Sequence, residues 1–253
     1  MNSDNLDEHL SQIETHWSAV FRAHQGSSDE ASLGLAALVQ RYGGAVHRYL
    51  LALLRDVDAA DELAQEFALR FLRGDFKNAE PSKGRFRDFL KRAVYHLMVD
   101  YQRARRAQPR LIGEKCTEPA SPASDPWETN LDHQFLTSWR DQLLARAWTE
   151  LDRVQARTGQ PFADVLRLRV EGPDLRSAEL ADRLSLRRGS PVKAGWVRLN
   201  LHRAREIFVK TLIDEVRNSL GEHGSPSLED ELNELGLLEY CRSALRRRRQ
   251  RSE

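Results

Sequence analysis

Apolar residues recur at the spacing of an α-helix along most of this chain, and this periodicity restricts the fold more than any other feature. Alternation of the kind seen in strands is scarce. Apolar stripes over 35–54, 60–72 and 86–101 predict three amphipathic helices, close enough in sequence to enclose one small core. Asp58 is the expected N-cap of the second helix, and Gly74 is expected to end it.

A change of composition separates these helices from a second group. Residues 109–126 hold four of the nine prolines, with Ser, Ala and Thr between them, which is typical of a flexible linker. Further stripes predict helices over 136–154, 162–170, 177–184 and 194–212, with a loop at 185–193. A short helix, a loop and a basic helix follow one another in helix-turn-helix order. We therefore predict an all-α chain in which the linker joins two small helical domains, with a helical C-terminal extension.

Charge is distributed unevenly, although the formal net charge is only +1. Residues 56–66 carry five acids and no base, whereas residues 85–110 carry eight Lys or Arg against two acids. Residues 187–210 carry seven bases against one acid, and the tail changes from acidic at 222–239 to arginine-rich at 242–251. Basic stretches beside acidic ones are typical of a protein that meets both nucleic acid and protein.

Cysteine usage and motifs argue against several classes of protein. Cys116 and Cys241 lie far apart and form no CxxC, so we expect neither a disulfide nor a zinc site. HExxH, Gly-rich phosphate loops and GxSxG are absent, so we expect no enzyme and no cofactor. The acidic N-terminal sequence is unlike a signal peptide, and no apolar run approaches the ~20 residues that span a bilayer. These features predict a soluble, cytoplasmic protein that does not bind a membrane.

Three segments carry candidate binding residues. The helix over 85–106 joins an apolar stripe to a dense set of Lys and Arg, which nucleic-acid phosphates explain and a solvated basic face explains equally well. In the helix over 194–210, Arg198, Asn200 and their neighbours are expected to face outward as base-reading groups, with a generic helical hairpin as the alternative. The acidic run over 56–70 either favours a helix N-terminus or binds a basic partner.

Taken in order along the chain, these segments resemble extracytoplasmic-function (ECF) sigma factors. In the first domain the likeness lies in LVQRYGGAVHRYLLALLRDVDAADELAQEFALRFLRG and in GRFRDFLKRAVYHLMVDYQRARR. In the second domain it lies in FADVLRLRVEG, SAELADRL and GWVRLNLHRARE. The resemblance implies a region 2 that binds core RNA polymerase and melts the −10 promoter element, followed by a region 4 that reads the −35 element. The implied partners are the beta-prime clamp and beta flap of core RNA polymerase, promoter DNA and, if one exists, an anti-sigma factor.

The resemblance also implies roles for particular residues. The residues implied to bind polymerase are Asp61, Glu62, Gln65 and Glu66. The −10 DNA falls to Arg85, Arg87, Phe89, Lys91, Arg92, His96, Arg103, Arg105 and Arg106, and the loop 76–86 is expected to accept an unstacked base. The residues implied to bind the −35 duplex are Ser177, Trp196, Arg198, Asn200, His202, Arg203 and Arg205.

The expected domain boundaries follow from these assignments. They give an N-terminal extension at 1–29, region 2 at 30–108, a Pro-rich linker at 109–129, region 4 at 130–215 and a C-terminal extension at 216–253. The extension has no counterpart in the minimal family plan. It is expected either to regulate access to DNA or polymerase, its acidic half imitating DNA, or simply to pack on the second domain.

Two departures from the family pattern and two rival functions remain open. His96 stands where the family commonly has Asn, and the turn between Leu184 and Gly195 is longer than usual. One rival is a stand-alone helix-turn-helix regulator that never joins polymerase. The other is a helical adaptor that binds only protein.

Overall fold

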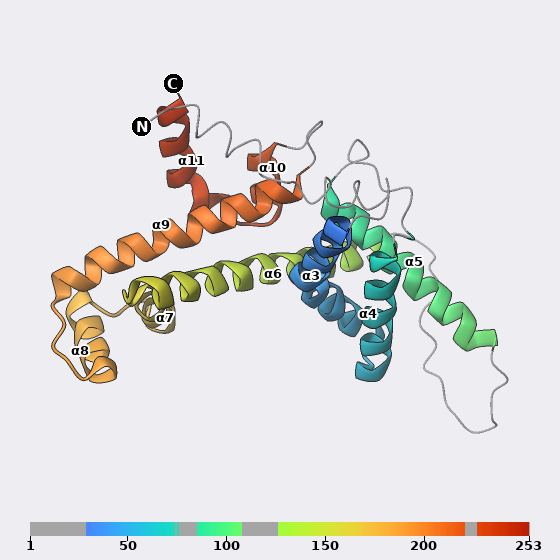
Figure 1. Ribbon diagram of the computed structural model, residues 1–253, viewed down its shortest axis with the longest axis horizontal. Helices are drawn as coiled ribbons and strands as arrows, with labels where there is room; N and C mark the ends of the chain where they lie inside the picture. Colours follow the sequence, from blue (N-terminus) through green and yellow to red (C-terminus); the bar gives the residue numbers. More distant parts are fainter. Residues whose placement is uncertain (1–28, 74, 76–84, 108–125, 221–226, 253) are drawn as a thin grey trace. The chain divides into compact units, whose positions relative to one another are not determined.

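The computed structural model describes residues 29–73, 75, 85–107, 126–220 and 227–252. Regular structure in these ranges is entirely helical, as the sequence predicted (Figure 1). The helices are α3 (Asp29–Leu54), α4 (Val57–Leu72), α5 (Phe86–Ala107), α6 (Pro126–Thr158), α7 (Phe162–Glu171), α8 (Ser177–Arg188), α9 (Ala194–Ser219), α10 (Leu228–Glu234) and α11 (Leu238–Ser252). None of these described helices is long and apolar enough to cross a membrane. The predictions for residues 1–28, Gly74, the loop 76–84 and the stretch 108–125 lie outside the described residues.

The chain divides into two compact units, and the boundary falls inside α6. The first unit comprises the chain up to Gln142 together with Asn218–Leu228, and the second comprises Leu143–Arg217 and Glu229–Glu253. This boundary lies further along the chain than the predicted one at 129/130. The first half of α6 belongs to the first unit because its aromatic side chains are buried there: Phe135 and Trp139 are 2% and 0% exposed.

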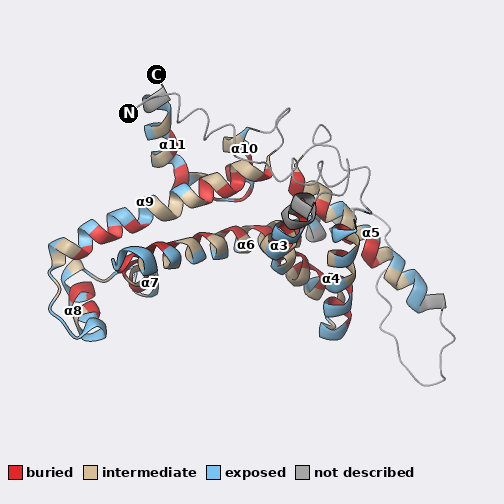
Figure 2. Ribbon diagram, in the orientation of Figure 1, coloured by how far each residue is buried: buried red, intermediate tan, exposed pale blue. Residues whose placement is uncertain are grey.

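The core of the first unit is built from four helices rather than the predicted three. The Tyr42 ring of α3 stacks on the Trp139 ring of α6, with centroids 4.5 Å apart. The Tyr49 ring meets Phe135 edge-on at 5.0 Å. Buried side chains from α4 and α5 complete this core, and Figure 2 shows the buried faces of the helices in red.

Polar contacts fix the same half of α6 against α3. The side-chain amide of Gln142 donates a hydrogen bond to the Arg41 carbonyl at 2.7 Å and accepts one from Arg48 at 2.8 Å. Arg48 also donates to the Ser138 carbonyl at 3.2 Å. A half-buried backbone carbonyl requires such a donor, so these bonds help to fix the position of α6 along α3.

Helix α4 begins two residues before the position that the sequence predicted, since Asp58 was the expected N-cap. Asp56, in an extended conformation, is the N-cap, and its carboxylate accepts a hydrogen bond from the Ala59 N–H at 3.1 Å. Asp58 instead lies within the first turn, where its negative charge complements the helix dipole. The helix ends at Leu72 with Arg73 as C-cap.

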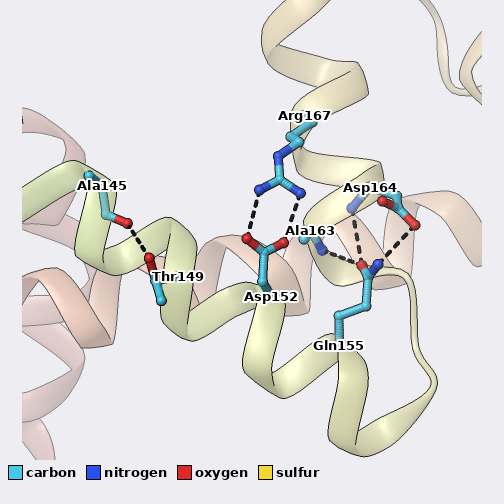
Figure 3. Close-up of polar contacts among 7 residues, drawn as sticks. All are labelled: Ala145, Thr149, Asp152, Gln155, Ala163, Asp164 and Arg167. Carbon is cyan, nitrogen blue, oxygen red and sulfur yellow. Dashed lines mark hydrogen bonds and ion pairs between the residues drawn. The ribbon is translucent and has the colours of Figure 1, made fainter.

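In the second unit, α7 is held against the second half of α6 by two polar contacts (Figure 3). Arg167 donates two hydrogen bonds to the Asp152 carboxylate, each at 2.8 Å. The bond to Asp152 raises the pKa of Arg167 above its ordinary value. The Gln155 amide oxygen accepts hydrogen bonds from the N–H groups of Ala163 and Asp164, at 2.9 and 3.1 Å. Gln155 therefore satisfies two of the donors that a helix N-terminus leaves unpaired.

One apolar cluster joins α6, α7, α8 and α9. Its fully buried members come from each of the four helices: Leu151, Phe162, Ala163, Val165, Leu168, Leu180, Ala181, Leu184, Val197 and Ala204. Trp148 and Phe208 pack at its edge with ring centroids 5.0 Å apart. This cluster positions α8 and α9, which carry the residues predicted to contact the −35 duplex.

The C-terminal segment is folded and belongs to the second unit. The predicted helical extension contains two helices, α10 and α11, because the chain turns at Gly236, whose φ of +68° favours glycine. Leu232, Leu237 and Cys241 are 0%, 5% and 0% exposed. The arginines of α11 form ion pairs: Arg248 with Asp214 of α9 at 3.2 Å, and Arg249 with Glu229 of α10.

Candidate nucleic-acid and protein-binding surfaces

The acidic residues of α4 lie on its solvent side. Asp61, Glu62 and Gln65 are exposed, while Leu63 and Phe67 of the same helix are buried at 3% each. Two acids of this helix pair with basic side chains. The first is Asp61, whose carboxylate lies 2.6 Å from His47 Nε2. Glu66 is half-buried and accepts a hydrogen bond from Arg70 at 2.6 Å. Glu62 and Gln65 therefore present the most accessible polar groups of this face.

Exposed apolar side chains extend the acidic face of α4, and our reading of the sequence missed them. Leu69 is 48% exposed and Leu72 is 41% exposed. Positions 62, 65, 69 and 72 share one side of a helix, because residues three and four apart are neighbours on its surface. That spacing is the signal that could have revealed them. We call this set, Asp61, Glu62, Gln65, Leu69 and Leu72, the α4 face.

Helix α5 has a buried face and a basic outward face, as its periodicity predicted. Phe86, Leu90 and Val94 are 0%, 2% and 0% exposed. The outward face carries the predicted DNA-binding residues that are exposed: Arg92, His96, Arg103 and Arg105. The side chain of Arg106 lies outside the described residues.

Two residues predicted to contact DNA from α5 are not on its outward face. Arg87 is only 3% exposed, so it lies in the buried part of the helix and not on the face where the −10 DNA is expected. Position 87 directly follows Phe86 and precedes Leu90 by three residues, and this spacing places it at the edge of the buried stripe. Phe89 is half-buried in a ring cluster, with its centroid 6.0 Å from Phe86 and 6.5 Å from Phe71.

Several cations of α5 form ion pairs within the first unit. Lys91 lies 2.6 Å from Asp132 of α6, and Arg105 lies 3.9 Å from Asp56. Arg85 and Arg103 pair with acids three residues away, at 3.8 and 4.0 Å. Exposed pairs of this kind contribute about 0–1 kcal/mol each, so a polyanion can replace the acids at little cost.

In the second unit, α9 presents a basic outward face. Arg198, His202, Arg203 and Arg205 are exposed, as predicted, and Leu199 among them is 48% exposed. His202 lies 3.5 Å from Glu206, which also lies 3.6 Å from Arg247 of α11. Ser177 is the first residue of α8 and is half-buried.

Asn200 corrects the prediction for α9, because it faces the core. It is 2% exposed, and its side-chain N–H group donates to the Trp196 carbonyl at 3.0 Å. The spacing 197, 200, 201 and 204 repeats the helical period, so Asn200 shares the inward stripe with Val197, Leu201 and Ala204. A residue on that stripe cannot reach a base edge.

Trp196 lies at the start of α9 and is partly buried, as the sequence reading favoured. The Arg188 guanidinium lies over its ring, 5.5 Å from the centroid, a cation–π contact. The segment between Leu184 and Gly195, which the sequence suggested is an unusually long turn, is partly helical. Helix α8 continues to Arg188, and only 189–193 form the turn, in which Gly189 has a φ of +65°.

The turn is tied to α8 by one serine. The Ser185 hydroxyl donates to the Ala181 carbonyl at 2.7 Å and accepts from the Val192 N–H at 2.8 Å. Val192 itself packs at the edge of the apolar cluster. The turn therefore holds α9 in a fixed register to α8.

Comparison with known proteins decides the identity of the first unit. Residues 38–108 match the family model of sigma-70 region 2. No curated protein and no solved structure matches the chain. The chain carries a sigma-70 region 2 domain.

The matched residues include the greater part of α3 and all of α4 and α5, and the α4 face and the basic face of α5 lie within them. A region 2 domain implies a sigma factor with a role in transcription initiation, which binds core RNA polymerase and promoter DNA. A region 2 domain binds polymerase and DNA without catalysing a reaction, in line with the prediction for residues 38–108. The match ends before the first half of α6, although Trp139 completes the core of the same unit.

Proposed function

We propose that this chain is a cytoplasmic sigma factor of the ECF type that directs core RNA polymerase to promoters with a −35 and a −10 element. The observation that carries the proposal is an ordered pair of units. A region 2 domain comes first, and a separately packed unit follows it, in which a short helix, a turn and a basic helix succeed one another. A helix-turn-helix of this order places its second helix in the major groove.

The α4 face is our candidate for the contact with the beta-prime clamp. It combines acids at its N-terminal end with exposed leucines at its C-terminal end. Acids steer and orient a basic partner, while the exposed leucines offer apolar area to bury. Region 2 would thus dock through the helix face that carries Glu62, Gln65 and Leu69.

The outward face of α5 is our candidate for the −10 DNA. Arg92, His96, Arg103 and Arg105 are exposed along it, and each neutralised phosphate releases condensed counterions. Because His96 stands on this face where the family commonly has Asn, its −10 preference is expected to differ from that of relatives.

The outward face of α9 is our candidate for reading the −35 duplex. Arg198, His202, Arg203 and Arg205 supply donors for base edges and phosphates. Asn200 is no longer part of the proposal. Trp196 is expected to act indirectly, because its ring supports the Arg188 guanidinium beside the start of α9.

The C-terminal extension is best explained by packing. Two of its acids are engaged within the second unit, since Glu229 pairs with Arg249 and Glu231 is fully buried. Deletion after Asn218 would remove the buried side chains of Leu232, Leu237 and Cys241, which are 0%, 5% and 0% exposed, and is expected to destabilise this unit. A regulatory role for the extension is therefore better tested by point changes on α11 than by truncation.

Binding to core polymerase tests the proposed docking face. Glu62→Lys should weaken the complex at least about tenfold, because like charges would face each other at the interface. Asp141→Lys is the matched control, since Asp141 is an exposed acid of the same unit outside the α4 face. Fluorescence anisotropy of labelled protein titrated with core polymerase measures both.

The outcomes separate the proposal from its rivals. A stand-alone regulator predicts that the wild type binds duplex DNA tightly and core polymerase not at all. A protein adaptor predicts complexes that do not depend on salt and no affinity for DNA. Equal losses in the Glu62→Lys and Asp141→Lys variants would remove the α4 face from the proposal while leaving polymerase binding in place.

A further inference from the structure

Leu199 is an apolar side chain on the outward face of α9. It is 48% exposed, whereas Val197 and Leu201, two positions away on either side, are 1% and 7% exposed. Successive residues of an α-helix are about 100° apart, so a displacement of two positions turns a side chain to the opposite side. Leu199 therefore belongs to the face that α9 presents outward.

Hydrogen-bond donors surround this apolar spot. Arg198 precedes it, and His202 and Arg203, three and four residues further on, are its surface neighbours; all three are exposed. The acid nearest on this face, Glu206, lies 3.5 Å from His202 and 3.6 Å from Arg247, so basic groups offset its charge. The surface thus suits an anionic partner that also offers an apolar group within one helical turn.

The major groove of DNA has this combination. Phosphates line it, and thymine alone among the four bases projects a methyl group into it, at C5. We propose that Leu199 contacts the 5-methyl group of a thymine in the −35 element and thereby sets the base preference at that position. The proposal rests on the −35 role of α9 given above.

The Leu199→Ala variant is expected to fold as the wild type does. Because Leu199 is half exposed and the core residues of α9 lie on its other side, Leu199→Ala leaves the apolar cluster intact. Alanine is also the best helix former, so α9 is expected to keep its structure. A loss of affinity in this variant would then report on the interface.

Replacing thymine by deoxyuridine tests the proposal, because the two bases differ only in the methyl group. The holoenzyme is assembled with the full-length chain, and its equilibrium binding is measured on a duplex that carries a −35 element recovered by promoter selection. Each thymine of that element is replaced in turn. We expect one position at which the replacement weakens wild-type binding about fourfold, the factor that corresponds to burying one methyl group.

The Leu199→Ala variant should not respond to the replacement at that position, since it lacks the partner of the methyl group. Val170→Ala serves as the matched control, because Val170 is an apolar side chain of α7 that is 64% exposed; it should respond as the wild type does. Equal responses of wild type and Leu199→Ala at every thymine would overturn the proposal, as would a −35 element without thymine. Failure of the wild-type holoenzyme to bind any promoter would instead overturn the −35 role itself.

Discussion

Replacing Trp139 by alanine should selectively loosen the first unit, although this residue lies outside the stretch that matches region 2. Trp139 is fully buried, its ring stacks on Tyr42 at 4.5 Å, and the Phe135 ring lies 6.2 Å away. If this packing is part of the region 2 core, its loss must lower the hydrogen-exchange protection of α3. If the match at 38–108 marks the whole folding unit, α3 should not respond.

The expected magnitude follows from three terms. Truncating a buried Trp to Ala costs about 3–5 kcal/mol, and that range includes a contribution of about 0.5–1.5 kcal/mol from an aromatic pair. Within the described residues the Trp139 indole N–H has no hydrogen-bond partner, and removing a buried donor of this kind returns about 1–3 kcal/mol. The net destabilisation is therefore about 2 kcal/mol, which corresponds to about a thirtyfold increase in local opening.

Hydrogen exchange of the α3 backbone amides in the full-length chain measures this opening directly. Trp139→Phe is the informative companion, because it keeps a ring against Tyr42 and removes the unpaired N–H; its effect should stay below about tenfold. Asp141→Ala, an exposed change on the same helix, should leave exchange unaltered. Protection of α3 within threefold of wild type in Trp139→Ala would refute the reasoning.

Three further predictions concern the second unit. Asn200→Leu should raise the free energy of unfolding by about 1 kcal/mol, since the buried Asn200 amide oxygen has no hydrogen-bond partner among the described residues; urea denaturation checks this, and an unchanged or lower midpoint contradicts it. Burial raises the pKa of the Cys241 thiol to about 11, so the folded state should lose stability as the pH rises from about 9 to 11, by about 2–3 kcal/mol in total. Wild type and Cys241→Ala should therefore diverge over that window in urea titrations, and parallel curves would exclude this role of the thiol. Arg198→Ala should weaken holoenzyme binding to matched −35 duplexes by about tenfold or more and spare scrambled ones, whereas equal losses would reduce Arg198 to a phosphate contact.

The helices could be predicted because apolar periodicity records which side of a helix is buried. The stripe predicted over 162–170 corresponds to α7 at Phe162–Glu171, and the stripe over 60–72 corresponds to α4 at Val57–Leu72. The partner against which a stripe packs is not recorded in the same way. Trp139 belongs to a stripe that continues through Leu143 and Leu151, so only its contact with Tyr42 reveals that α6 contributes to both units.

The candidate site was predicted well where charge and exposure coincide, and poorly where they do not. Arg198 and Arg203 are basic and exposed, as expected, whereas Arg87 and Asn200 are polar and buried. Polar residue type was given more weight than helical position, although the spacing of position 200 from Val197 and Ala204 already indicated burial. Leu199 was overlooked for the opposite reason. It is apolar but exposed, and an apolar residue outside the buried stripe of a helix suggests no binding role by its type alone.

Initiation by core RNA polymerase tests the central claim most directly. Run-off transcription would be measured on a promoter library with core polymerase alone and with the full-length chain added. A sigma factor predicts transcripts only when the chain is present, from templates that share one −35 and one −10 element at constant spacing. Polymerase that starts no new transcripts with the folded chain present, at any template of the library, would contradict the account.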